Sequence, residues 1–202
     1  REAVPEDEAG VFALEGGYEP YFDEIPTAYA RLGVEFPLFS RRTYAAKGVI
    51  SSVGLSYAGI SGIFIPHTGE PNVNIDQPAL LMLSAAAHET AHSLGIARED
   101  EANFVSYLAC SCSENPSIAY SGTMLALIHC GNKLYAADKD KYFALYATYS
   151  DAMVRDLAHY NAYWDSFEGP VEEAATTLND NYLKFNLSLI HISEPTRHLR
   201  IS

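Results

Sequence analysis

Apolar residues follow helical spacing over most of the chain and strand-like patterns in one short region. Residues 20–32 carry an apolar face and predict a helix that ends at Gly33. Residues 55–66 combine aromatic and β-branched residues with glycines, which favours a loosely jointed strand. After a turn at 68–71, residues 72–75 alternate polar and apolar side chains and predict a short edge strand.

The most apolar helical stretch covers residues 77–94. Asp76 stands where an N-cap is expected, and Pro78 suits the first turn of a helix. Gly95 follows the last periodic residue, where a left-handed glycine commonly ends a helix. This stretch is therefore predicted to be the central helix.

A second helix is predicted to begin near Ala97 or Arg98, and the chain after Pro116 has a helical pattern for most of its remainder. Three breaks are expected in this half: near Gly131, near Ser150 and at the Gly169-Pro170 pair. The patterns together predict a mainly α fold of the α+β class, with the central helix beside a small sheet and a helical C-terminal half.

Composition changes along the chain and indicates three parts. Residues 1–18 are acidic and contain glycine, which is typical of a linker or lead-in, and residues 19–186 form the predicted domain. Residues 187–202 lose helical periodicity, turn basic, and resemble translated sequencing-adapter DNA. We expect them to be a non-native tail, so His191 and His198 are not candidate ligands.

The net charge of −13 argues against nucleic acid or an anionic membrane surface as a partner. Three cysteines are too few for a disulfide scaffold or a cysteine-rich zinc site, and we read them as small buried apolar residues, although two of them could pair: Cys110, Cys112 and Cys130. The longest apolar stretches are well below the ~20 residues that cross a bilayer, so this part of the chain is expected to be soluble.

The strongest chemical signal is the sequence HETAH at residues 88–92. On a helix, His88 and His92 lie on one face a turn apart, and two imidazoles at this spacing can reach one tetrahedral Zn²⁺. Glu89 then points to the metal-bound water and can accept its proton as the water attacks a carbonyl group. The pattern predicts one zinc ion and hydrolytic chemistry.

A third metal ligand is expected from the acidic residues that follow the glycine turn. A helix, a turn at Gly95 and a second helix bring either Glu99 or Glu101 back toward the histidines. The acids that do not bind metal suit the N-terminus of the new helix, which favours negative charge. The spacing alone leaves both glutamates as candidates.

Other residues are candidates for binding substrate or stabilising a transition state. Asn72 and Asn74 lie on the predicted edge strand and could bind a peptide backbone, although turn-forming asparagine explains them equally well. An oxyanion needs a donor opposite the metal. Four side chains are open candidates for that donor, each more simply explained as a core or surface residue: Tyr120, His129, His159 and Tyr163. His67, which precedes the turn, could line the cleft, and it too is more simply explained as an ordinary residue.

Residues 45–186 resemble the bacterial family called domain of unknown function 3810, most specifically at TGEPNVN and at HETAH followed by GIAREDEANF. That family looks like membrane-anchored, zincin-like peptidases. The resemblance implies a zincin-like metallopeptidase domain over residues 19–186, anchored through segments missing from this chain. With an odd number of anchoring helices and an internal N-terminus, the domain would be extracytoplasmic.

The run from Glu99 to Asn103 resembles the second-ligand helix of gluzincins with a short linker, in which the first glutamate binds zinc. By that resemblance Glu99 is preferred to Glu101, and Asn103 would orient His88 or His92. The main hypothesis is thus a zinc metallopeptidase acting on peptides or proteins, with Glu89 as general base. The alternatives are a non-catalytic zinc-binding sensor or interaction domain at a membrane and, least favoured, a helical domain with an accidental motif.

Overall fold

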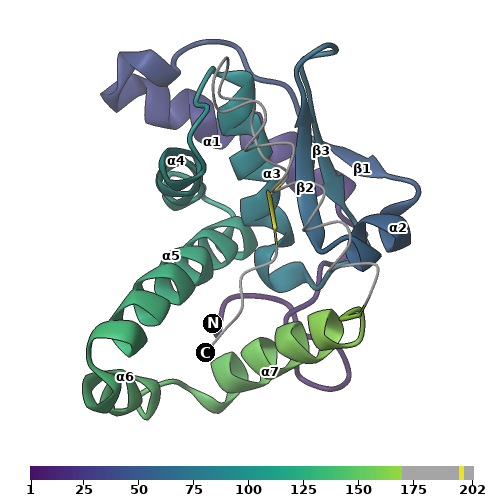
Figure 1. Cartoon of the computed structure of the whole chain (residues 1–202). Coiled ribbons are helices and arrows are strands. Elements are labelled where there is room, and N and C mark those ends of the chain that lie inside the picture. Colours follow the sequence, from purple (N-terminus) through teal and green to yellow (C-terminus); the bar gives the residue numbers. More distant parts are fainter. Residues whose placement is uncertain (170–195, 198–202) are drawn as a thin grey trace, which may run out of the picture.

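The structure is a computed structural model that describes residues 1–169 and 196–197 (Figure 1). Within residues 1–169 it is mainly helical, with seven α-helices and a small mixed sheet of three strands, which agrees with the predicted α+β class. In chain order the elements are α1 (Glu19–Glu35), the 3-10 helix η1 (Pro37–Phe39), β1 (Lys47–Val49), α2 (Ser52–Tyr57), β2 (Ile60–Ile65), β3 (Glu70–Asn74), α3 (Ala79–Ser93), α4 (Glu99–Ser111), α5 (Pro116–Ala137), α6 (Lys139–Tyr146), α7 (Asp151–Asp165) and β4 (Thr196–Arg197).

The sheet has the order β1-β3-β2-β4. β3 runs parallel to β1 and antiparallel to β2, with Val73 opposite both Gly48 and Gly62. The prediction of an edge strand at residues 72–75 is therefore wrong, because β3 lies inside the sheet. Its alternating pattern reflects burial on both faces: Val73 is in the core, and the buried Asn74 amide donates to the Ile60 carbonyl (3.0 Å).

The single strand predicted over residues 55–66 is also wrong in its first part. Residues up to Tyr57 belong to the short helix α2, and β2 begins only at Ile60. Gly59 has a φ of 66°, a left-handed conformation that L-residues with side chains rarely adopt, and it turns the chain from helix to strand. The aromatic and β-branched content of the segment did not reveal this turn.

Helix α3 is the central element of the fold, as predicted. It lies between the sheet and the other helices, in contact with β2 and β3 on one side and with α1, α4 and α5 on the others (Figure 1). Every residue from Leu80 to His92 is buried. Gly95, with a φ of 95°, follows the end of the helix as expected from the sequence.

The start of α3 differs from the prediction. Pro78 is the N-cap residue, and no side chain caps this end. Asp76 instead accepts a hydrogen bond from the Tyr163 hydroxyl (2.6 Å) and so links the end of β3 to α7. Asp76 therefore binds a residue distant in the sequence instead of capping α3.

Helices α4 to α7 confirm the helical C-terminal half. The break predicted near Gly131 is wrong, because α5 runs without interruption to Ala137 and the chain turns at Asp138, whose side chain caps α6. The break near Ser150 is confirmed, since its hydroxyl accepts a hydrogen bond from the Met153 amide at the start of α7. Pro170 lies outside the described residues, and so does most of the tail from residue 187 on, with His191 and His198.

Residues 1–18, which have the composition of a linker or lead-in, pack on the helices. Phe12 is buried, and its amide donates to the buried Asp156 carboxylate of α7 (2.7 Å). The same carboxylate accepts hydrogen bonds from Arg1 (2.5 and 3.1 Å) and from the Tyr120 hydroxyl of α5 (2.7 Å). This buried acid thus joins the first residues to two helices far along the chain.

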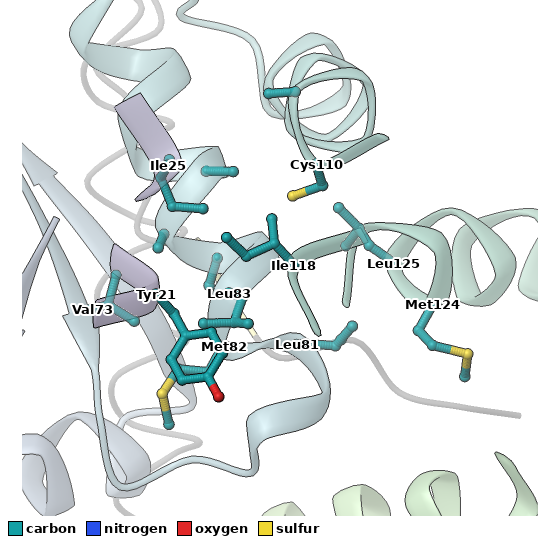
Figure 2. Close-up of a cluster of buried hydrophobic side chains, with 14 of the residues drawn as sticks. Tyr21, Ile25, Val73, Leu81, Met82, Leu83, Cys110, Ile118, Met124 and Leu125 are labelled. Atoms are coloured by element: carbon teal, nitrogen blue, oxygen red, sulfur yellow. The ribbon is translucent and has the colours of Figure 1, made fainter. Parts of the chain in front are cut away.

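The apolar core gathers around α3, and Figure 2 shows side chains from α1, β3, α3, α4 and α5. Cys110 is buried there, whereas Cys112 is half-buried and Cys130 is exposed, so the prediction of three buried cysteines holds only in part. All three are free thiols. None of the described helices is long and apolar enough to cross a membrane.

Candidate metal centre

Helix α3 places His88 and His92 on one face, with both imidazoles buried. Their Nε2 atoms lie 3.1 Å apart, and the ring centroids are 4.8 Å apart in an edge-to-face arrangement. A buried helix fixed on several sides holds both rings in place, because neither can turn without displacing its neighbours. The four-residue spacing therefore produces the paired imidazoles that it predicts.

Glu99, the first residue of α4, brings a carboxylate to the same point. The turn at Gly95 reverses the chain, so that Glu99 Oε2 lies 3.0 Å from His88 Nε2 and Oε1 lies 3.4 Å from His92 Nε2. One ligand atom from each of these three residues lies within 4.8 Å of the others. Two imidazole nitrogens and a carboxylate oxygen therefore converge on one point.

The second nitrogen of each ring is already occupied by a hydrogen bond. His92 Nδ1 donates to the Ile96 carbonyl (2.6 Å), and His88 Nδ1 donates to the side-chain oxygen of Asn103 (2.8 Å). A carbonyl oxygen can only accept, so the hydrogen sits on Nδ1 and the Nε2 of each neutral ring carries a lone pair. Three acceptors then face one another, which is unfavourable unless a cation lies between them.

The distances fit a small divalent cation. Metal–nitrogen and metal–oxygen bonds of about 2.0–2.1 Å at tetrahedral angles place neighbouring ligand atoms about 3.3 Å apart. The two Nε2 atoms are 3.1 Å apart, and each lies near a different oxygen of the Glu99 carboxylate, His88 Nε2 at 3.0 Å from Oε2 and His92 Nε2 at 3.4 Å from Oε1, which are separations close to that value. The described residues therefore form a group that could bind a metal ion, and imidazole with carboxylate is a donor set that suits Zn²⁺.

The electrostatics of the three ligands point the same way. Burial raises the pKa of Glu99, but hydrogen bonds to His88 and His92 outweigh it and lower that pKa to about 2. Burial lowers the pKa of His92, whereas its hydrogen bond to Glu99 and the charge of Glu89 together raise it above the ordinary value. In the absence of a metal ion, the histidines and Glu99 therefore favour binding a proton at the same point.

Glu89 follows the first histidine and lies on the side of α3 that faces the sheet. Its side chain is fully buried, and its carboxylate lies against Gly62 of β2. Phe64, two residues further along β2, has its ring centroid 6.3 Å from that of His92. Gly62 and Phe64, on one face of β2, therefore lie beside Glu89 and His92 respectively.

The remaining predicted site residues have other partners. Glu101 is exposed, and its carboxylate is 3.5 Å from the guanidinium of Arg98, the N-cap residue of α4. Asn72 donates to the Glu70 carbonyl (2.9 Å) on its own strand. Asn74 is buried and donates to Ser56 of α2 (2.9 Å). The group that could hold a metal thus includes Glu99 and not Glu101.

Of the four candidate donors, Tyr120 and Tyr163 are engaged in hydrogen bonds to Asp156 and Asp76, and His159 is exposed. His67, the candidate to line the cleft, is also exposed. His129 of α5 is half-buried, and its buried Nε2 has no hydrogen-bond partner among the described residues. Burial lowers the pKa of His129, and the charge of His88 lowers it further.

Sequence reasoning did not identify the Ile96 carbonyl, Gly62 or Phe64. Any residue offers a backbone carbonyl, so no residue type marks the partner of His92. The roles of Gly62 and Phe64 depend on how β2 lies on α3, which local patterns do not contain. The glycine within an apolar strand pattern was the one available signal, since it often marks close approach of another group.

Comparisons with curated proteins and with solved structures gave no match. A comparison with protein families matched residues 1–188 to a family described as protein of unknown function (DUF3810). The match includes α3, α4 and the whole candidate metal centre. The chain therefore belongs to the DUF3810 family.

Proposed function

We propose that this domain is a zincin-like zinc metallopeptidase that hydrolyses peptide bonds. The proposal rests on one observation above all: Nε2 of His88, Nε2 of His92 and the Glu99 carboxylate face one point, with both Nδ1 hydrogens directed away from it. A bound zinc ion would supply Lewis acidity and lower the pKa of a bound water to about 7.

The protein residues around that point have complementary roles. Glu89 is buried beside the ligands and accepts the proton of the attacking water, as expected of a general base. Asn103 and the Ile96 carbonyl hold the imidazoles in the tautomer that leaves Nε2 free for a metal. His129 is the candidate donor to the developing oxyanion, because its buried Nε2 has no hydrogen-bond partner in the part of the chain that the structure describes, and because it lies within the electrostatic reach of His88.

β2, rather than β3, is the strand that would hold a peptide substrate. It is the strand that contacts both Glu89 and His92. On the side away from β3, β2 pairs antiparallel with Thr196–Arg197, and a peptide substrate would take the place of that segment. Backbone pairing along it would place a peptide bond beside the metal ligands. By the family resemblance, the domain would be anchored to a membrane by segments outside this chain and would face away from the cytoplasm.

The test compares wild type with Glu89→Gln, His92→Ala and Glu101→Gln for zinc content and for cleavage of a mixed peptide library. Wild type and Glu101→Gln should hold about one equivalent of zinc and cleave peptides. Glu89→Gln should retain zinc and lose cleavage by about 10²–10⁴-fold, and His92→Ala should lose both.

Wild-type protein without zinc after metal-replete purification would contradict the metal centre, and full cleavage by Glu89→Gln would contradict the mechanism. Zinc at full occupancy with no cleavage by wild type would favour the alternative, a zinc-binding sensor or interaction domain.

A further inference from the structure

Gly62 lies in the middle of β2, where a glycine is unfavourable. Glycine weakens a strand because its backbone loses much freedom on folding and it offers no side chain to pack. Its usual advantage is a left-handed backbone conformation, but Gly62 is not among the residues with positive φ. It is also paired with Val73 of β3 in the regular antiparallel register, and the register shift between Ile60 and Gly62 lies on the other side of β2, toward β4. Backbone conformation therefore does not explain this glycine.

The space beside Gly62 does explain it. A Cβ atom at this position would lie 2.7 Å from Oε1, 2.8 Å from Cγ and 3.0 Å from the carboxyl carbon of Glu89. Such contacts are well inside van der Waals distance, and three of them on one buried side chain cannot be relieved by a small rotation. The Glu89 carboxylate occupies the volume that any other residue at position 62 would fill.

We propose that Gly62 is the positioning residue for Glu89: the missing side chain makes the space that holds the carboxylate between α3 and β2. This inference rests on the proposed function for its catalytic consequence, because Glu89 is there the general base. The steric contact itself is independent of any activity.

Gly54, in the helix that precedes β2, has no such contact. Gly54 in α2 has no atom within 4 Å of where its Cβ would be, so a methyl group there meets open space. A Gly54→Ala variant therefore adds the same methyl group without touching Glu89, and it serves as the matched control for Gly62→Ala.

The first measurement is catalytic. In Gly62→Ala the carboxylate is pushed from its position while His88, His92 and Glu99 are untouched. The expected result is full zinc content, a KM close to that of wild type and a kcat lower by on the order of 100-fold, the effect of misplacing a catalytic group by about 1 Å. Gly54→Ala should match wild type in all three. A Gly62→Ala variant with wild-type kcat would overturn the proposal.

The second measurement needs no activity and separates this inference from the proposed function. Thermal unfolding is compared for Gly62→Ala in the wild-type background and in the Glu89→Ala background. Because the clash requires the Glu89 side chain, alanine at position 62 should lower Tm by about 4 °C or more in the first background and leave it unchanged or higher in the second.

An equal fall in Tm in both backgrounds would overturn the contact. If Gly62→Ala alone does not fold, recovery of folding in the double variant supports the proposal, and failure of the double variant to fold overturns it. If wild type proves to cleave no peptide, the proposed function fails while this thermal comparison still decides whether Gly62 positions Glu89.

Discussion

Nδ1 of His88 and the side-chain oxygen of Asn103 lie 2.8 Å apart, and the bond joins the central helix to the helix that carries Glu99. Asn103 is one turn after Glu99 on α4, so the same helix face presents both the carboxylate and the acceptor. His88 therefore contacts α4 through both nitrogens, since its Nε2 is 3.0 Å from Glu99.

The bond to Asn103 gives a direct prediction for metal affinity. Asn103→Ala removes the acceptor that fixes the His88 tautomer, and we expect zinc affinity to fall by about 10–100-fold while the stoichiometry at saturation stays the same. Asn103→Asp keeps an acceptor at this position and should retain most of the affinity. Competition with a chromophoric chelator measures both, and equal affinities for Asn103→Ala and wild type would contradict this role.

The two glutamates of α4 should behave differently. Glu99→Ala removes a carboxylate that lies 3.0 Å from His88 and should abolish stoichiometric zinc binding, as expected for loss of one of three protein ligands. Glu101→Ala removes an exposed acid near Arg98 and should leave zinc content unchanged. Metal analysis of the two purified variants decides the matter, and the reverse order would assign the ligand to Glu101.

Zinc affinity should fall in acid. The pKa of His92 is raised, so below that pKa a proton occupies the nitrogen that a metal needs, while Glu99, with a pKa of about 2, stays ionised. The apparent affinity should therefore fall up to about tenfold per pH unit below the pKa of His92 for each proton displaced. Chelator competition between pH 7.5 and 5.5 tests this, and an affinity that does not change with pH would refute it.

The cysteines should differ in reactivity. Burial raises the pKa of the Cys110 thiol to about 12, so at pH 8 only about 10⁻⁴ of it is thiolate, and the reagent has no access. We expect iodoacetamide to modify the exposed Cys130 in the native protein and Cys110 only after unfolding. Peptide mass spectrometry after timed alkylation gives the answer, and early labelling of Cys110 would show that α4 is not packed as described.

The Asp156 carboxylate should hold residues 1–18 on the domain. Asp156→Ala removes the acceptor shared by Arg1 and the Tyr120 hydroxyl, while Arg1 keeps its contacts with Glu6 and the Gly10 carbonyl, and the loss of these charged hydrogen bonds should destabilise the fold by about 2–3 kcal/mol. Tyr120→Phe removes one neutral donor and should cost about 1 kcal/mol. Urea unfolding gives both values, and limited proteolysis should cut residues 1–18 faster in Asp156→Ala only.

Much of the fold is visible in the sequence because helices depend on local spacing. The apolar run of α3 and the glycine after it predict a buried helix with a defined end, and the structure agrees. The strand region was harder, because the same residue types occur in α2 and β2 and only Ala58 and Gly59 separate the two elements. Which strand lies at the edge depends on pairing over long sequence distances, and so β3 was misplaced.

The candidate site, like the fold, could be predicted from the sequence only in part. The two histidines could be paired from their spacing, since any helix places them on one face. The choice between Glu99 and Glu101 depends on the helix phase: α4 begins at Glu99, so Glu99 and Asn103 share a face, while Glu101 is about 200° further around the helix and points elsewhere. Gly62 could not be matched to Glu89, because that contact exists only once the sheet lies on α3.

The hydrogen bond from the Phe12 amide to Asp156 spans 144 positions of the chain. During synthesis at about 5–20 residues per second, Phe12 is added to the chain roughly 7–30 s before Asp156. Phe12 and Val4, both buried in the finished domain, stay exposed to solvent and to chaperones for that time. Docking of residues 1–18 therefore cannot be completed before α7 has been synthesised.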